Sequence, residues 1–157
     1  MPNIVVLSDT HSKLGRLLKD AQSDLVKALD ECDIIFHLGD GEDDVHKLEL
    51  LYPSKVVYVR GNCDQSSDTL FRIIDIENIR FLLTHGHKFS VKSTLIKLEL
   101  ECRYRTANVG LFGHSHRVVS EDMGDLLLLN PGSIATSKTY MVIAVDKDKI
   151  SYKIFQI

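Results

Sequence analysis

Polar side chains that can bind metal ions or carry protons follow five apolar runs of the sequence, each where the run ends. These segments read DTH, GD, GNCD, THGH and GHSH, at residues 9–11, 39–40, 61–64, 84–87 and 113–116. Ligands of open α/β sheets bind outside the carboxyl ends of the strands, so the five segments are expected to meet at one site. The glycines beside these polar residues allow a sharp turn of the backbone or the close approach of a ligand.

The donor atoms in these segments are carboxylate oxygens, imidazole nitrogens and one amide oxygen, which makes metal binding their natural use. The chain has no GxSxG nucleophile elbow and no GK[ST] phosphate loop. Four histidines together with two aspartates favour Mn, Fe, Zn, Ni or Co over Mg and Ca, because Mg and Ca prefer shells of oxygen. A carboxylate can bridge two cations through its two oxygens, and Asp40 is the best candidate for that bridge.

The elements that must position these segments alternate between strand and helix in the first half of the chain. Apolar runs at 4–7, 34–38 and 55–59 predict strands. An amphipathic helix is expected over 14–29, because apolar residues recur there at three- and four-residue steps, and a shorter helix is expected over 43–51. Together these elements predict a parallel βαβαβ arrangement.

The second half of the chain is expected to be richer in strands. Strands at 71–76 and 79–83 have a hairpin spacing, and a helix near 92–104 follows them. Five further strands are predicted near 109–112, 118–120, 126–129, 140–145 and 150–154. Early helices and late strands together predict an α/β fold of two packed sheets flanked by helices, formed by a single domain over residues 1–157.

From Asp9 to His116, the ordered motifs DxH, GD, GNx[DE], H and GHxH resemble the pattern of the calcineurin-like metallophosphoesterase superfamily. The forms GNCD, THGH and NPGS are similar to its compact bacterial and archaeal phosphodiesterase branch. The resemblance implies a four-layer α-β-β-α sandwich of two mixed sheets, a small phosphate ester as substrate, and two divalent transition metal ions, of which we favour Mn. The implied ligands are Asp9, His11 and His116 for the first metal, Asn62, His85 and His114 for the second, and Asp40 for both.

Two divalent cations would bring four positive charges to this site, and Asp9 and Asp40 would return only two negative ones. The site would therefore stay positive and attract an anionic ester. A water that bridges both metals would be held as hydroxide and would attack phosphorus in line, so no covalent protein nucleophile is needed.

Cys63 departs from the family pattern, because many members carry histidine there, and that histidine is the usual candidate for protonating the leaving alkoxide. A thiol with an unperturbed pKa near ~8.5 donates weakly, and a thiolate near two cations would sooner act as a ligand. His87 could supply the proton or contact the phosphate, and leaving groups of low pKa need no acid. The predicted catalytic residues are Asp40, Asn62, Cys63 and His87.

The composition of the 157-residue chain excludes several classes of protein. A net charge of −3 with scattered Lys and Arg makes nucleic acid an unlikely partner. No apolar run approaches the length of a membrane span, and the run at 4–7 is too short for a secretory signal, so we expect a cytoplasmic protein. The three cysteines are expected to be reduced, and assembly into a homo-oligomer stays open.

Ordinary structural roles compete with function at several other residues. His37 is expected to be a satisfied buried histidine and His46 a solvated one. Asp64 could orient a neighbouring loop or be a simple turn residue, and the NPGS segment at 130–133 could lie beside the metals or be an ordinary turn. Two alternatives to a phosphodiesterase stay open, namely a phosphomonoesterase (a nucleotidase or protein phosphatase) and a non-catalytic binding scaffold of the same fold.

Overall fold

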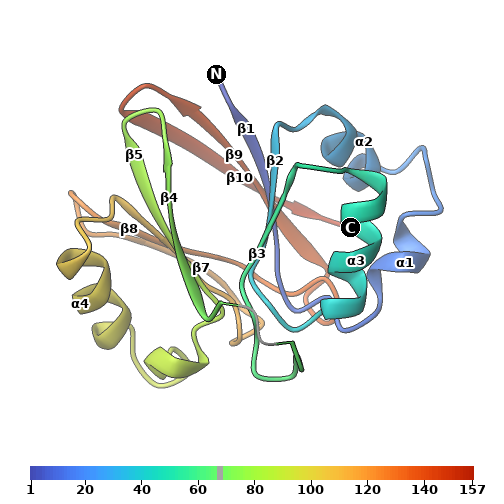
Figure 1. Ribbon diagram of the computed structural model, residues 1–157. Helices are drawn as coiled ribbons and strands as arrows, with labels where there is room; N and C mark the ends of the chain where they lie inside the picture. Colours follow the sequence, from blue (N-terminus) through green and yellow to red (C-terminus); the bar gives the residue numbers. More distant parts are fainter. Residues whose placement is uncertain (67–68) are drawn as a thin grey trace.

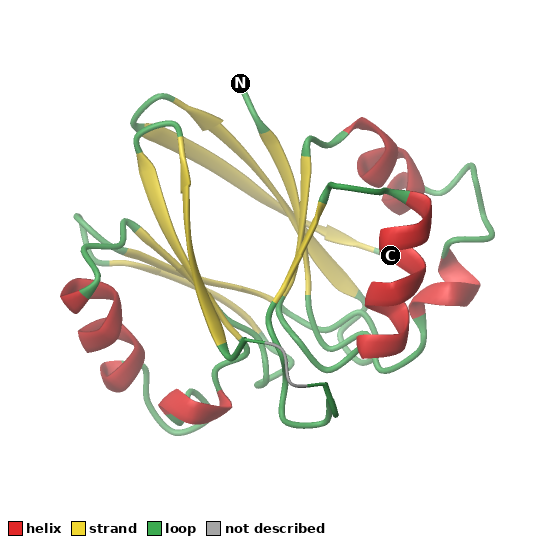
Figure 2. Ribbon diagram, in the orientation of Figure 1, coloured by secondary structure: helices red, strands yellow, loops and turns green. Residues whose placement is uncertain are grey.

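Two five-stranded mixed sheets pack face to face in the computed structural model, which describes residues 1–66 and 69–157 (Figure 1). Helices lie on the outer face of each sheet, so the layers run helix, sheet, sheet, helix (Figure 2). This arrangement confirms the predicted α/β sandwich.

The first sheet combines three parallel strands from the first half of the chain with a hairpin from its end. Its order is β10 (Lys149–Gln156), β9 (Thr139–Asp146), β1 (Asn3–Leu7), β2 (Ile34–His37) and β3 (Val56–Tyr58). β1, β2 and β3 pair in parallel as predicted, while β9 pairs antiparallel with both β1 and β10. The carboxyl ends of β1, β2 and β3 therefore lie at one edge of the sheet.

The second sheet is formed by the middle of the chain. Its order is β4 (Phe71–Ile76), β5 (Ile79–Thr84), β6 (Val109–Leu111), β8 (Leu127–Pro131) and β7 (Val118–Asp122). β4 and β5 form the predicted antiparallel hairpin, whereas β5, β6 and β8 run parallel. The loops after β5 and β6 consequently leave the sheet at the same edge, at the bottom of the molecule in Figure 1.

The helix predicted over residues 14–29 is two helices, α1 (Leu14–Leu17) and α2 (Asp24–Glu31). The break has a local cause, because the Asp20 carboxylate accepts a hydrogen bond from the backbone N–H of Gln22. The Ser23 hydroxyl then caps α2 by accepting from the backbone N–H of Val26 at 3.2 Å. The apolar periodicity continued through a turn because the residues on both sides pack on the same sheet.

The other helices follow the prediction more closely. α3 (Glu42–Leu51) begins one residue before the predicted start. α4 (Ile96–Tyr104) begins later than the predicted start near residue 92. Just before the helix, the Thr94 hydroxyl accepts a hydrogen bond from the backbone N–H of Ile96. A short 3-10 helix, η1 (His87–Phe89), was not predicted. No helix among residues 1–66 and 69–157 is long and apolar enough to cross a lipid bilayer.

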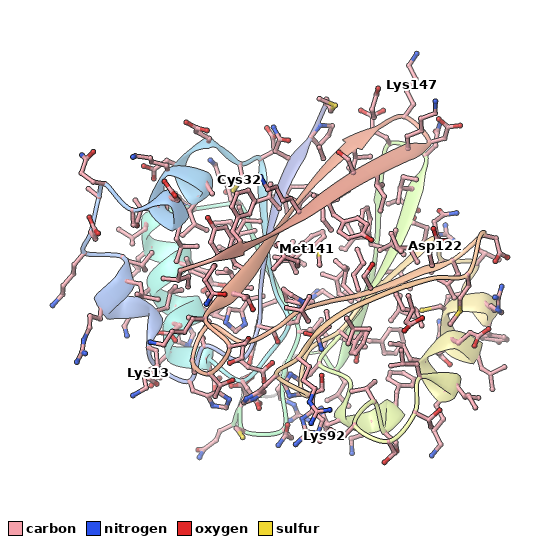
Figure 3. The ribbon with its side chains drawn as sticks, turned by 180° about the vertical axis from the view of Figure 1, so that it is seen from behind. Lys13, Cys32, Lys92, Asp122, Met141 and Lys147 are labelled. Carbon is pink, nitrogen blue, oxygen red and sulfur yellow. The ribbon has the colours of Figure 1, made fainter. Side chains whose placement is uncertain are left out.

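The largest apolar core lies between the two sheets. Phe36 of the first sheet meets Phe81 of the second edge to face, with 5.9 Å between ring centroids. Met141 of β9 is fully buried in the same core and lies near the middle of the molecule in Figure 3. Separate apolar clusters fix α1–α3 to the first sheet and α4 to the second. The site-bearing loops are thus attached to two rigid sheets that share one core.

Candidate metal centre

The loops after β1, β2, β3, β5 and β6 meet at one edge of the two sheets, near the bottom of Figure 1. They bring all seven candidate metal ligands into one cluster, although these residues span more than a hundred positions of the sequence. The seven are Asp9, His11, Asp40, Asn62, His85, His114 and His116.

One group of donor atoms forms around Asp9. Its Oδ1 lies 3.1 Å from Nε2 of His116 and 3.8 Å from Nε2 of His11. The two imidazole nitrogens are 3.4 Å apart, so all three donors face one another. This group could hold one cation, as predicted for the first metal.

A second group forms around His85, which is fully buried. Its Nε2 lies 3.2 Å from Oδ2 of Asp40, 3.2 Å from Nδ1 of His114 and 2.9 Å from Oδ1 of Asn62. Asp40 Oδ2 also lies 3.9 Å from Nε2 of His11, a member of the first group. Asp40 is therefore placed between the two groups, where a bridging carboxylate would have to be.

Buried polar atoms show that these residues fit a metal ion. Asp9 Oδ1 is buried and has no hydrogen-bond partner among the described residues, although its neighbours are ring nitrogens. A carboxylate oxygen in that position is costly unless a cation satisfies it. His85 Nδ1 donates to the backbone carbonyl of Leu38 at 2.8 Å, which leaves Nε2 of a neutral ring as a lone pair aimed at the site.

The backbone of the site is strained where the ligands attach. Left-handed φ angles are rare for residues other than glycine, because they cost of order 1–3 kcal/mol each. Where a folded protein retains them, they are found mostly at functional sites. Five of the seven candidate ligands adopt them: Asp9 (52°), His11 (44°), Asp40 (58°), His114 (66°) and His116 (60°). Rigid packing around the loops has to maintain this strain.

Close packing at Gly113 is part of that support. A Cβ built there would lie 2.8 Å from Oδ2 of Asp9 and closer still to Oγ of Ser8. The backbone N–H of His114 donates to the same Asp9 Oδ2 at 3.0 Å, and the Ser8 hydroxyl donates to it at 2.6 Å. One oxygen of Asp9 is thus used to hold the loops together, and the other faces the histidines.

Asp64 joins the loops after β2 and β3. Its carboxylate accepts hydrogen bonds from the backbone N–H groups of Asp40 (2.9 Å), Gly41 (3.0 Å) and Gly61 (2.8 Å), and from the Tyr58 hydroxyl (2.6 Å). Burial opposes ionisation, but the hydrogen bonds from Tyr58 and the backbone outweigh it and lower the pKa of Asp64. Of the two roles left open by the sequence, Asp64 therefore has the orienting one.

The NPGS segment also contacts the site. Asn130 is fully buried and donates to the backbone carbonyl of Gly113 at 3.0 Å. The Ser133 hydroxyl donates to the backbone carbonyl of Asp9 at 2.8 Å, and Thr136 Oγ1 lies 3.1 Å from Nδ1 of His116. Through these contacts, Asn130, Ser133 and Thr136 hold the loops after β1 and β6 in place. Ser8 and Thr136 carried no signal in the sequence, because neither belongs to a motif.

His87 and Cys63, the two residues proposed to supply a proton, both lie near the candidate metal ligands. The ring of His87 is 5.4 Å from that of His85 and 6.2 Å from that of His114, measured between centroids. Cys63 is exposed, and its Sγ lies within 4.8 Å of donor atoms of His11 and Asp40. Burial and then the negative charge of Asp40 raise the pKa of the Cys63 thiol.

A cavity of about 380 Å³ borders these residues. His11, Asp40 and Cys63 lie on one side of it, and Glu42 and Asp43 add acidic side chains to its wall. The backbone N–H of Cys63 donates to Oδ1 of Asp40 at 2.8 Å, which fixes the loop at the cavity mouth. A substrate in this cavity would contact both the candidate metal ligands and the thiol.

His37 lies beneath the site as a neutral, hydrogen-bonded histidine. It is fully buried, its Nδ1 accepts the backbone N–H of Gly39 at 3.2 Å, and its Nε2 donates to Thr10 Oγ1 at 3.0 Å. Burial lowers its pKa from the ordinary 6.5 to about 4. The structure thus places it in the ordinary structural role expected from the sequence.

Acid should therefore destabilise the protein through His37. Between pH 6.5 and pH 4 the unfolded chain binds a proton at this residue and the folded chain does not, so stability falls as pH falls. Chemical denaturation in the presence of a chelator should show the wild type losing about 3 kcal/mol more than His37→Gln over this range. His46→Gln is the control, because that side chain is exposed. Equal losses in wild type and His37→Gln would contradict the assignment.

Comparisons with known proteins show which family the chain belongs to. A family model described as the calcineurin-like phosphoesterase superfamily domain matches residues 3–148. The probable metallophosphoesterase YsnB of Bacillus subtilis is 30% identical over 161 residues, covering 98% of this chain and 90% of YsnB. The probable metallophosphoesterase MJ0623 of Methanocaldococcus jannaschii is 34% identical over 162 residues, covering 98% and 81%.

A relative named as a phosphodiesterase and two solved structures add to this. Phosphodiesterase YfcE of Escherichia coli K12 is 33% identical over 93 residues, covering 54% of this chain and 47% of YfcE. Vps29 of Cryptosporidium parvum matches the fold with a TM-score of 0.84, at 17% identity over 99% of this chain and 91% of its own. An archaeal phosphodiesterase matches with a TM-score of 0.72, at 22% identity over 98% and 99%. The family match and the full-length relatives show that the chain belongs to the calcineurin-like phosphoesterase superfamily.

Proposed function

We propose that the chain is a phosphodiesterase that uses two divalent metal ions, with Mn favoured. The observation that carries this proposal is the position of Asp40 between two groups of donor atoms, one around Asp9 and one around His85. When bound, the ions would supply a hydroxide nucleophile at neutral pH and neutralise charge on the equatorial phosphate oxygens.

The chain's own residues would hold the reactants in place. Asp9 and Asp40 are the only carboxylates in the proposed ligand set, so the loaded site keeps a net positive charge toward an anionic ester. Asn62 is exposed and its Oδ1 lies 2.9 Å from Nε2 of His85, so its amide can also meet substrate beside the second group. His87 borders the second group, close enough to contact a phosphate oxygen.

The charge of the cavity wall supports a diester over a monoester. Glu42 and Asp43 line the cavity beside Asp40 and would repel the second negative charge that a monoester carries at neutral pH. A diester carries one negative charge and meets less repulsion. The names of YfcE and of the archaeal phosphodiesterase point to the same class of substrate.

The test compares two aryl substrates with the manganese-loaded protein. We expect kcat/KM for bis(4-nitrophenyl) phosphate to exceed that for 4-nitrophenyl phosphate by about tenfold or more, which corresponds to about 1.4 kcal/mol. Preference for the monoester would contradict the phosphodiesterase proposal. Turnover of neither substrate would also contradict the proposal and would favour a non-catalytic binding scaffold of the same fold.

A further inference from the structure

A second cavity, of about 360 Å³, adjoins the one at the metal centre. Ser12 lines both cavities, and His11, the residue before it, lines the first, so the second cavity lies next to the candidate metal centre. Three cationic side chains line the second cavity, namely Lys13, Arg16 and Lys138. In Figure 3, Lys13 lies at the lower edge of the molecule, the edge at which the ligand loops gather.

The walls of this cavity belong to the same segments that position the metal ligands. The backbone N–H of Lys13 donates to the carbonyl of Thr10, within the loop between Asp9 and His11, at 2.8 Å. On the opposite wall, the backbone N–H of Ala135 donates to the carbonyl of Asp9 at 3.3 Å. The backbone that carries Lys13 is thus held at a fixed position relative to the candidate metal centre.

The second cavity differs from the first in charge. No Asp or Glu side chain from the described residues lines it, whereas Glu42 and Asp43 line the first. Its three cations make no ion pair with a described side chain. Ile157 also lines the cavity and brings no charged side chain to it. This leaves a net positive pocket in a chain whose overall charge is −3.

Apart from Ser12, the remaining lining of the cavity is apolar. Leu17, Ile134 and Ala135 contribute to its wall, and Ile134 is 2% exposed. An apolar wall beside cations suits a ligand that carries an anionic group on an organic body such as a sugar or base. Phosphate is an anion that both lysine and arginine bind well.

We propose that this cationic cavity binds a second phosphate group of the substrate. The chain would then select phosphodiesters in which one arm carries a further phosphate, such as a dinucleotide with a terminal phosphate. The inference rests on the proposed phosphodiesterase function, because it places the ester to be cleaved at the metal centre and the second phosphate next to Lys13, Arg16 and Lys138.

The experiment follows cleavage of the internucleotide bond in dithymidine dinucleotides by the manganese-loaded protein. Three forms are compared: one with a 5′-phosphate, one with a 3′-phosphate and one with neither. We expect at least one phosphorylated form to have a kcat/KM about tenfold or more above the unphosphorylated form. Equal values for all three forms in the wild type would overturn the proposal.

A triple variant, Lys13→Gln, Arg16→Gln and Lys138→Asn, removes the cations of the cavity. Asparagine is chosen at Lys138 because the φ of this residue is 57°, which asparagine tolerates. The matched control is Lys27→Gln, Lys97→Gln and Lys147→Asn, since Lys147 also has a φ of 57° and lies at the opposite end of the molecule in Figure 3. The higher kcat/KM of the phosphorylated dinucleotide should be lost in the variant of Lys13, Arg16 and Lys138 and kept in the control variant.

Two further measurements separate failure of this proposal from failure of the proposed function. Turnover of bis(4-nitrophenyl) phosphate should stay within about twofold in both variants, because that substrate has no second phosphate. If the wild type cleaves no diester, the proposed function fails. Calorimetric titration of the chelated protein with the phosphorylated dinucleotides then decides on the cavity. About tenfold weaker binding by the triple variant supports the proposal, and equal or undetectable binding by both proteins overturns it.

Discussion

Replacing Asp40 with asparagine is expected to lower kcat/KM for a diester by about 1,000-fold, equivalent to about 4 kcal/mol of transition-state stabilisation. Asparagine keeps the shape of the side chain but removes the charge that both donor groups share. Burial alone would raise the pKa of Asp40, but its 3.2 Å contact with the His85 imidazole and the hydrogen bond from the backbone N–H of Cys63 lower it, so the wild-type carboxylate is ionised. Steady-state kinetics at saturating Mn measures the loss.

The matched control for this variant is Asp43→Asn. Asp43 lines the same cavity but belongs to none of the donor groups among the described residues, and its side chain is exposed. The Asp43→Asn variant removes one negative charge near the substrate and leaves the candidate metal ligands unchanged. Its kcat/KM should therefore stay within about threefold of the wild-type value. An Asp40→Asn protein that keeps a tenth or more of wild-type activity would show that the two donor groups do not act together.

The second large effect is expected at Cys63, where Cys63→His should speed cleavage of esters with poor leaving groups. General acids contribute about 100-fold or more when the leaving group is a basic alkoxide. Burial and the negative charge of Asp40 raise the pKa of the Cys63 thiol, so the thiol is a poorer proton donor than an imidazolium would be at this position. Turnover of an unphosphorylated dinucleotide, whose leaving group is an alkoxide, should therefore rise.

Two substrates with different leaving groups show whether the histidine introduced by Cys63→His would act as a proton donor or would speed every reaction at the site. 4-Nitrophenolate needs no protonation, so bis(4-nitrophenyl) phosphate should be cleaved at nearly the same rate by wild type and Cys63→His. Cys63→Ser is the control, since a hydroxyl is no better an acid than the thiol. An equal gain for both substrates, or a gain for the dinucleotide in Cys63→Ser, would contradict a role in protonating the leaving group.

The sequence predicted the strands, and the meeting of the five polar segments at one edge, better than it predicted the helices. Each polar segment directly follows an apolar run, and strands that run parallel must present their carboxyl ends at one edge. The helix over 14–29 was wrong at Asp20 and Ser23, because apolar periodicity reports which residues face the sheet and not whether the backbone stays helical. α1 ends at Leu17, and the segment that follows forms a turn in which the Asp20 carboxylate accepts the backbone N–H of Gln22.

The contacts that hold the ligands could not be predicted, because they join distant parts of the chain. Ser133 and Asp9 are 124 residues apart, and only the fold brings the serine hydroxyl to the Asp9 carbonyl. The left-handed backbone of His11 and His116 leaves no signal either, since residue type favours such angles strongly only for glycine. The cationic cavity is hidden for the same reason, because Lys138 joins Lys13 and Arg16 only after β9 pairs with β1.

The number of metal ions bound per chain tests the two-metal site most directly. Chelated wild-type protein would be titrated with Mn²⁺ by calorimetry, and diester hydrolysis would be followed in the same samples. We expect two ions per chain, with activity that reaches its maximum only when both are bound, because the groups around Asp9 and His85 each supply their own histidines and share Asp40. Full activity with one ion per chain, or hydrolysis that persists with none, would contradict the site described above.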